Sequence, residues 1–253
     1  DVNNGPNFVD PLNSNKEVRD YHIRPSVQLL NKGSNDLYVK NVVKVVGDPN
    51  ATAIPSTEVD LGNNARLVDN AIDVGAYEYE APLQQIVYVK ADLTGTADGK
   101  SWETALGDLQ GAVDLAGLYA QNNSTDNNPV YGYVFVHGNY HDTGTLNLTL
   151  GNTKVYGSMN DELSSESDNS QQIVEDLLAK RKGLLEATNR SSVNNVALNA
   201  DCVIDGFVVA GTANVNGGVL STSIVENDVT GTTGTADGLL YNSLVLGNVS
   251  GVK

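Results

Sequence analysis

Two carboxylates, Asp205 and Glu226, are the side chains of this sequence best suited to catalysis. They fall in neighbouring sequence repeats, and hydrolysis of a glycosidic bond needs two carboxyl groups that face each other. The two acids do not hold equivalent positions in the repeats, and acids on the surface of a repeat protein are common. If the chain is an enzyme, we expect Asp205 and Glu226 to be its catalytic pair.

Cleavage of a polyuronate by a lyase would need a basic side chain to take a proton, and cations to neutralise the substrate carboxylate. Between Asp201 and Val252 the sequence has no lysine or arginine. The basic cluster from Lys180 to Lys182 lies in a predicted helix, where solvation is its expected role. The sequence therefore favours a non-catalytic protein, with a polysaccharide lyase or glycoside hydrolase as the alternative.

The spacing of side chains that could ligate a metal gives little evidence for a metal site. His137 and His141 are four residues apart, which brings two ligands to one metal on a helix. They flank Gly138-Asn139-Tyr140, which is typical of a turn, so we expect packing roles instead. Without an Asp-x-Asp-x-Asp loop we expect no cofactor, and Ca²⁺ stays an alternative. Its candidate ligands are Asp201, Asp205 and Asp228.

Exposed aromatic rings are candidates for glycan binding, because an amphipathic ring can stack on a sugar. Trp102 and Tyr119 lie at helical spacing with other apolar residues, so we expect them to face the core. The rings that are freer to be exposed are Tyr131, Tyr133, Tyr140 and Tyr156. The expected partners are therefore glycans or another surface protein.

The composition excludes several partners. The 253 residues include 31 acidic and 15 basic side chains, for a formal net charge of −16. Such a field repels nucleic acid and anionic lipid, so neither is expected to bind. No apolar run approaches the roughly 20 residues of a membrane helix, so no direct membrane insertion is expected. The single cysteine, Cys202, lies in an apolar run and is expected to be a buried, inert thiol.

The elements that position these side chains are mostly short strands. Runs of Val, Leu and Ile separated by turn formers are typical of an all-β protein. From residue 201 a repeat aligns Phe207, Ile224 and Leu244, each after a small residue, at spacings of 17 and 20 residues. A recurrence of about 20 residues predicts a solenoid whose coils stack about 4.8 Å apart.

Helical periodicity predicts a helix over residues 101–120, with Ser101 as its N-cap. An open solenoid end exposes strand edges and apolar core, and this helix can cover both. A second helix is predicted over residues 173–185. Strands are predicted over residues 21–24, 39–46 and 72–79.

The run Ile72-Asp73-Val74-Gly75-Ala76-Tyr77-Glu78, with Asp20-Tyr21-His22-Ile23-Arg24 before it, resembles the closing segment of a unit in secreted β-helix proteins of the Bacteroidetes type, over about residues 3–80. Ile86-Val87-Tyr88-Val89 and Gly99-Lys100-Ser101-Trp102 resemble the beginning of another, over about residues 86–210. The resemblance implies a right-handed parallel β-helix of the pectate-lyase-like fold, secreted or at the bacterial cell surface. It implies no reaction.

We therefore predict a mainly β protein in two parts. Residues 1–84 are the closing segment of a β-helix-type unit. Residues 85–253 start a second right-handed parallel β-helix, with a capping helix at about 101–120 and coils over about 130–253. The predicted function is a non-catalytic, extracellular, adhesin-like or carbohydrate-binding module of a larger chain, or alternatively a structural subunit of a surface assembly. An open last coil predicts end-to-end or edge-strand self-association.

Overall fold

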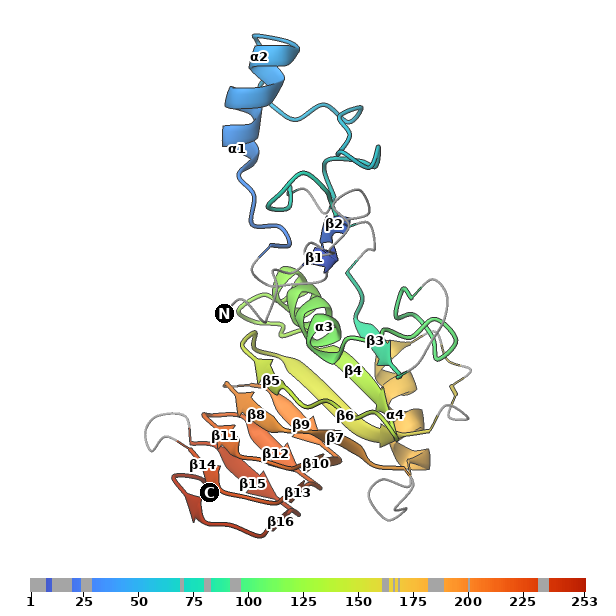
Figure 1. The fold of residues 1–253 in the computed structure, drawn as a ribbon, viewed down its shortest axis with the longest axis vertical. Helices are drawn as coiled ribbons and strands as arrows, with labels where there is room; N and C mark the ends of the chain where they lie inside the picture. Colours follow the sequence, from blue (N-terminus) through green and yellow to red (C-terminus); the bar gives the residue numbers. More distant parts are fainter. Residues whose placement is uncertain are drawn as a thin grey trace. The chain divides into compact units, whose positions relative to one another are not determined.

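The computed structural model describes residues 8–10, 20–23, 29–68, 71–79, 83–91, 97–160, 164–165, 167, 169–181, 189–199, 201–231 and 237–253. The chain divides into two compact units, Asp1–Pro82 and Leu83–Lys253 (Figure 1). Each unit is described by itself below.

The second unit is mainly β, and its strands form three sheets in which every pairing is parallel. The coarse prediction of a mainly β chain with parallel strands is thus confirmed. The six-stranded sheet contains β3 (Ile86–Val89), β4 (Gly132–His137), β6 (Thr153–Met159), β9 (Val203–Asp205), β12 (Val219–Ser221) and β15 (Leu239–Tyr241). The five-stranded sheet contains β5 (Thr145–Leu148), β8 (Asn195–Leu198), β11 (Ala213–Val215), β14 (Val229–Thr230) and β17 (Val249–Ser250). The four-stranded sheet contains β7 (Ser191–Val193), β10 (Phe207–Val209), β13 (Ile224–Val225) and β16 (Leu244–Val245).

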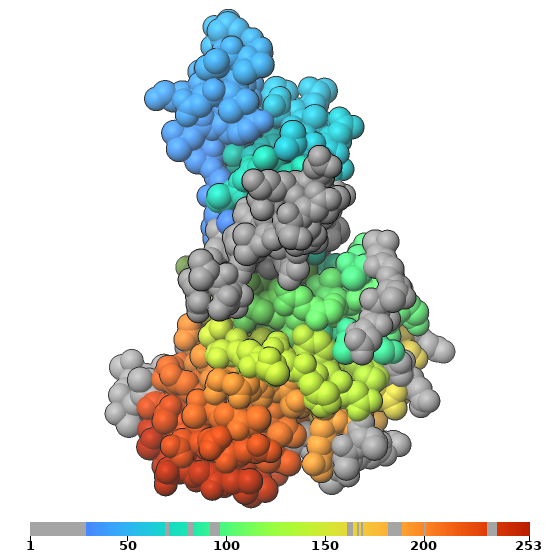
Figure 2. All heavy atoms as spheres, viewed as in Figure 1, coloured from blue at the N-terminus to red at the C-terminus, as the bar shows by residue number. Residues whose placement is uncertain are grey.

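From β9 onward, successive strands enter the six-, four- and five-stranded sheets in that fixed order, three times over. Each pass, here named a coil, lays its strands beside those of the pass before it. Val203 pairs with Val219 and Val219 pairs with Leu239, so one coil takes 16 residues and the next takes 20. In the space-filling view these coils form consecutive bands from orange to red (Figure 2).

The sequence alignment of the repeat is right in its second step and wrong by one residue in its first. Ile224 pairs with Leu244 as aligned, but its partner in the preceding coil is Val208 and not Phe207. The residues that are equivalent at this corner share a left-handed backbone and not a small side chain. They are Gly206 (φ 81°), Thr222 (φ 48°) and Asn242 (φ 47°).

The side chains that point between the three sheets form an apolar core. In the six-stranded sheet one fully buried residue comes from each of the first five strands: Val87, Val134, Val155, Ile204 and Leu220. The other sheets add Val193, Val196, Leu198, Val209, Ala213, Val215, Val225 and Val229. Full burial of one such Val, Leu or Ile side chain contributes about 1.5–3 kcal/mol.

Helix α3 (Leu109–Asn123) packs against β3, β4, β5 and β6. Its N-cap is Asp108, whose carboxylate accepts a hydrogen bond from the Gly111 amide at 3.2 Å. The predicted start at Ser101 is wrong, because an acid directly before the helix satisfies its free amides better than a serine seven residues upstream. A Cβ on Gly132 would lie 2.0 Å from the Ala116 carbonyl oxygen, so only glycine allows α3 this close to β4.

Helix α4 (Ser170–Lys180) lies on the outer face of the six-stranded sheet. The Asn169 side chain caps it by accepting a hydrogen bond from the Gln172 amide at 3.1 Å. The predicted helix is confirmed over residues 173–180, while residues 182–185 lie outside the described part of the chain. The apolar side of α4 packs into one cluster with the sheet, made of Trp102, Tyr133, Phe135, Met159, Val174 and Leu177.

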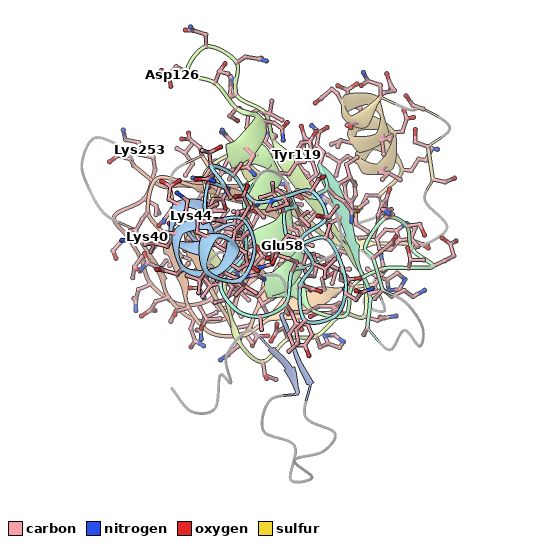
Figure 3. The ribbon with its side chains drawn as sticks, turned by 90° about the horizontal axis from the view of Figure 1, so that it is seen from above. Lys40, Lys44, Glu58, Tyr119, Asp126 and Lys253 are labelled. Atoms are coloured by element: carbon pink, nitrogen blue, oxygen red, sulfur yellow. The ribbon has the colours of Figure 1, made fainter. Side chains whose placement is uncertain are left out.

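In the first unit, the stretch that was predicted as a strand over residues 39–46 is helical, so that prediction is wrong. It comprises α1 (Asn35–Tyr38), the π-helical turn η2 (Val39–Val43) and α2 (Lys44–Val46). Val39 and Val43 are buried four residues apart, which is helical spacing, and Lys40 and Lys44 are exposed (Figure 3).

The run over residues 72–79 is not a strand either, because carboxylates take up its amides. Three amides donate in this way: Asp73 to Glu78 Oε2 at 3.0 Å, Glu78 to Asp60 Oδ2 at 2.8 Å, and Tyr79 to Asp73 Oδ2 at 2.8 Å. The Arg66 guanidinium lies 2.7 Å from the Glu78 carboxylate, with both side chains buried. Elsewhere in this unit β1 (Phe8–Asp10) pairs antiparallel with β2 (Asp20–Ile23), which confirms the strand predicted over residues 21–23. Arg24 lies outside the described residues.

Candidate binding face

The outer face of the six-stranded sheet presents two rows of side chains, because alternate residues of a strand point to opposite faces. The first row is Ile86, Tyr133, Lys154, Val203, Val219 and Leu239. The second row is Tyr88, Phe135, Tyr156, Asp205, Ser221 and Tyr241. Adjacent strands lie about 4.8 Å apart, so each row is continuous across the sheet.

Helix α4 covers the rows at the first strands and leaves them open at the last. Tyr133 and Phe135 are buried under α4, whereas Leu239 is 45% exposed and Tyr241 is 71% exposed. Val203 and Val219 between them are half-buried. We name the uncovered part the open face, defined as Tyr131, Lys154, Val203, Asp205, Val219, Leu239 and Tyr241.

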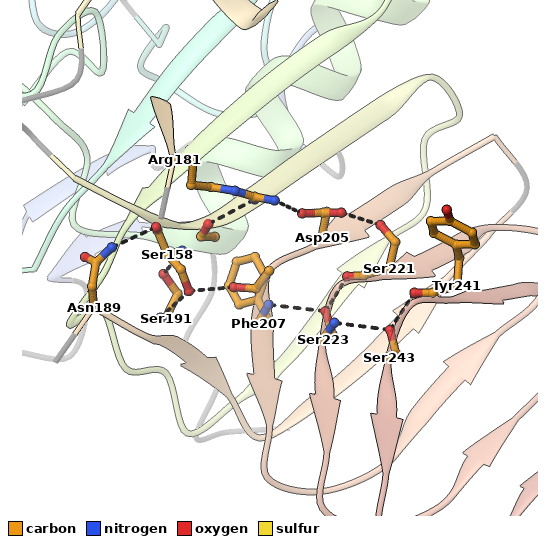
Figure 4. Close-up of polar contacts among 12 residues, drawn as sticks. Ser158, Arg181, Asn189, Ser191, Asp205, Phe207, Ser221, Ser223, Tyr241 and Ser243 are labelled. Carbon is orange, nitrogen blue, oxygen red and sulfur yellow. Dashed lines mark hydrogen bonds and ion pairs between the residues drawn. The ribbon is translucent and has the colours of Figure 1, made fainter. Parts of the chain in front are cut away.

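Asp205 in the second row is held by two partners (Figure 4). Its carboxylate forms an ion pair with Arg181, and the two side chains are only 14% and 11% exposed. Its second oxygen accepts a hydrogen bond from the Ser221 hydroxyl. Arg181 also donates to the Gly157 carbonyl at 3.2 Å, so it links the end of α4 to the sheet. The prediction that Arg181 is simply solvated is therefore wrong.

A ladder of serines lines the corner next to Asp205 (Figure 4). The Ser158 hydroxyl donates to the Gly206 carbonyl at 2.7 Å, and the Ser158 amide donates to Ser191 Oγ at 2.7 Å. In the next coils the Phe207 amide donates to Ser223 Oγ at 3.2 Å, and the Ser223 amide donates to Ser243 Oγ at 3.1 Å. These hydroxyls satisfy backbone groups where the chain turns between two sheets, so their role is structural.

Lys154 and Tyr131 form the cationic end of the open face. The Lys154 ammonium lies 3.7 Å from the centroid of the Tyr131 ring and 5.9 Å from that of Tyr133. Burial lowers the pKa of Lys154, because a partly desolvated ammonium loses hydration. The first strands of the open face thus place an amino group against an aromatic ring.

Two of the four tyrosines expected to bind glycans are buried. Tyr133 donates a hydrogen bond to Gln171 Oε1 at 3.2 Å. Tyr140 accepts from the Leu109 amide at 3.2 Å and donates to the Gly107 carbonyl at 3.1 Å, which ties it to the start of α3. Burial raises the pKa of Tyr140 and of Tyr156 to about 12. Of the other two, Tyr131 belongs to the open face and Tyr156 borders it, and both are half-buried.

The proposed catalytic carboxylates are not brought together by one sheet. Asp205 ends β9 in the six-stranded sheet, while Glu226 follows β13 in the four-stranded sheet and is exposed. Glu226 donates its amide to the Val209 carbonyl at 2.9 Å, so it is fixed on a different edge of the coil.

The candidate metal ligands are likewise dispersed. His141 Nδ1 lies 2.7 Å from Ser192 Oγ, whereas His137 packs with its ring 5.9 Å from that of Trp102. Asp228 accepts from the Asn248 amide at 2.8 Å, and Asp201 sits at a left-handed turn (φ 63°). Within the described ranges, no group of three His, Cys, Asp or Glu side chains is placed to hold a metal ion.

Cys202 is fully buried, as the sequence predicted. Burial raises the pKa of its thiol to about 11.

Sequence reasoning missed Lys154 and Tyr241, the cation and the most exposed ring of the open face. Their signal is the period-2 alternation within short strands, which puts each on the side opposite an inward-facing neighbour: the buried Val155 and the half-buried Leu240.

Comparison of the chain with family models, with curated proteins and with solved structures finds no match. Among the helices that the structure describes, none combines the length and the apolar character needed to cross a bilayer.

Proposed function

We propose that residues 83–253 form a right-handed parallel β-helix that acts as a non-catalytic, adhesin-like, carbohydrate-binding module at the cell surface. The fixed order in which strands enter three parallel sheets supports the β-helix. Connections between parallel strands of one sheet are right-handed in about 98% of cases, which supports the hand. Helix α3 packs on the first strands of the coils, where a cap would cover strand edges. The closing segment of a preceding β-helix-type unit is the corresponding proposal for the first unit.

The open face carries the proposal for binding. It combines a 71% exposed tyrosine ring, half-buried aliphatic side chains and a cation on one rigid sheet. Aromatic rings with adjacent polar groups suit sugars, which have both apolar faces and hydroxyls. A sheet holds these side chains in fixed positions, so little order is lost on binding.

The state of Asp205 supports the absence of catalysis. A general acid or nucleophile must reach the scissile bond, and this carboxylate is instead engaged by Arg181 and Ser221. A polysaccharide lyase or glycoside hydrolase that uses Asp205 and Glu226 is the alternative. An assay for the release of reducing or unsaturated sugar ends tests this alternative. Release that Asp205→Asn or Glu226→Gln abolishes would establish the enzyme and refute our proposal.

A glycan array with the purified chain tests binding. Tyr241→Ala should weaken every glycan signal, because it removes the most exposed ring of the open face. Leu244→Ala is the matched control, since Leu244 is 55% exposed in the same coil but belongs to the four-stranded sheet. Equal loss in both variants, or no glycan bound by the wild type, would contradict the proposal.

Self-association as a structural subunit is a second candidate, favoured by the last coil. Val249 is 50% exposed, although Val229, its partner in the preceding coil, is fully buried. Residues 237–253 hold one acid and one base, Asp237 and Lys253, which pair with each other. In a chain of net charge −16 this stretch is therefore neutral, and its exposed valine suits stacking against a further coil, which we propose a second copy can supply. Sedimentation velocity should show dimers that Val249→Lys dissociates, and a strict monomer at high concentration would refute the idea.

A further inference from the structure

Lys154 is an uncompensated cation on the open face. Lys100, Arg181 and Lys253 in the same unit each pair with an aspartate. Lys154 has no ion pair within the described residues, and its contacts are the rings of Tyr131 and Tyr133. Burial lowers the pKa of Lys154, and no carboxylate of the described residues contributes to that change.

The position of Lys154 on the sheet directs its charge toward a ligand. Its alkyl stem lies on the sheet and its ammonium rests against the Tyr131 ring, which keeps the charge at a fixed point. Tyr131 is itself held, because its carbonyl accepts a hydrogen bond from Gln85 Nε2 at 3.1 Å. A cation fixed in this way can donate hydrogen bonds without first losing side-chain entropy.

From Lys154 the first row continues through Val203 and Val219 to Leu239. Three strand spacings of about 4.8 Å make this row about 14 Å long. Tyr241 stands beside Leu239 in the second row, two residues along β15. A ligand that lies along the row would therefore meet a cation at one end and an exposed aromatic ring at the other.

We propose that the open face binds a saccharide that carries a carboxylate, with the carboxylate on Lys154 and a sugar ring on Tyr241. This inference rests on the proposed glycan-binding function and names the class of glycan. One lysine matches one carboxylate, so the ligand is a neutral glycan with a single acidic sugar rather than a polyuronate. The net charge of −16 does not prevent this, since exposed charges beyond about 8 Å are screened at physiological ionic strength.

The test compares two tetrasaccharides that are long enough to follow the row and differ in one group: cellotetraose, and the same chain with its terminal glucose replaced by glucuronic acid. Binding to the full chain is measured by isothermal titration calorimetry or by chemical-shift changes. A charge-assisted hydrogen bond predicts about 10- to 100-fold tighter binding of the acidic tetrasaccharide. A higher NaCl concentration should weaken binding of the acidic ligand more than binding of the neutral ligand.

Lys154→Met keeps the length of the side chain and should abolish the preference for the acidic tetrasaccharide. Lys154→Arg should retain it, and Lys100→Met is the matched control for loss of one positive charge at an exposed site. Circular dichroism confirms that each variant is folded.

Each outcome separates this inference from the function on which it rests. Equal binding of both tetrasaccharides, or a preference that survives in Lys154→Met, overturns the carboxylate site and leaves glycan binding intact. Failure to bind either tetrasaccharide overturns both proposals. A short peptide with a free C-terminal carboxylate is tested in parallel, and tighter binding of the peptide would overturn the saccharide assignment.

Discussion

Replacing Arg181 with methionine should destabilise the second unit by about 3 kcal/mol, because it leaves the Asp205 carboxylate buried without its cation. Loss of one partner from a buried ion pair costs about 3–5 kcal/mol. The low end applies, since the side chains are still 11% and 14% exposed and Ser221 continues to donate to Asp205. Each kcal/mol shifts the midpoint by about 2–4 °C in a unit of this size, so Tm should fall by about 6–12 °C.

The assay is thermal and urea unfolding followed by circular dichroism, in a double-mutant cycle with Asp205→Asn. The double variant removes both charges and should be less destabilised than the sum of the single variants, with a coupling energy of about 1.5–3 kcal/mol. Lys180→Met is the control, because Lys180 is exposed and its one hydrogen bond among the described residues goes to the Ser164 carbonyl. Its effect should stay below about 0.5 kcal/mol.

A coupling energy under about 0.5 kcal/mol would refute the reasoning, since two independent residues add within that range. The same cycle separates a structural Asp205 from a catalytic one. A structural role predicts that Asp205→Asn lowers Tm and changes no turnover, whereas a catalytic role predicts loss of turnover in a protein of unchanged Tm.

Three further predictions concern the rest of the chain. Burial raises the pKa of Glu78 from 4.5 to about 7, against the opposing effect of the Arg66 cation. Between these two pKa values the folded first unit therefore binds a proton that the unfolded chain releases. Its free energy of unfolding should fall by about 3 kcal/mol as pH rises from 4.5 to 7. Urea unfolding of Glu78→Gln should show no such dependence on pH. Gly157→Ala should destabilise the second unit by about 1–3 kcal/mol in calorimetry, because its Cβ would lie 2.6 Å from the Phe207 ring. Gly107→Ala is the control and should be near neutral, because a Cβ on Gly107 meets nothing within 4 Å. Cys202 should resist a thiol reagent at pH 8 in the folded protein and react in urea, and rapid labelling without urea would contradict its burial.

The sequence predicted the parallel strands well because their signal is local. Short β-branched runs between turn formers recur near the repeat distance. The step from Val219 to Leu239 has the predicted 20 residues, whereas the step from Val203 to Val219 has 16 and not 17. The same signal misled at Val39–Val43, where valines spaced four apart fit a helix as well as a strand. There the cap decides, since the Ser34 hydroxyl accepts from the Leu37 amide at 3.3 Å.

The candidate face was harder to predict because its contacts join distant residues. Arg181 and Asp205 are 24 residues apart and meet only because α4 ends beside the corner of the sheet. The one-residue error at Phe207 had a different cause. Thr222 and Asn242 adopt the left-handed backbone that Gly206 adopts, and residue type alone does not reveal that they are equivalent.

Successive coils differ in length, and this difference predicts where the chain tolerates insertions. The four residues by which the second coil exceeds the first fall between Thr230 and Leu239, because the strand pairings on both sides keep their register. At the opposite corner, Ser221 and Ile224 are separated by two residues, and the serine ladder fixes both coils there. Insertions, whether arising in evolution or grafted as foreign peptides, should therefore be tolerated at the first corner and disruptive at the second.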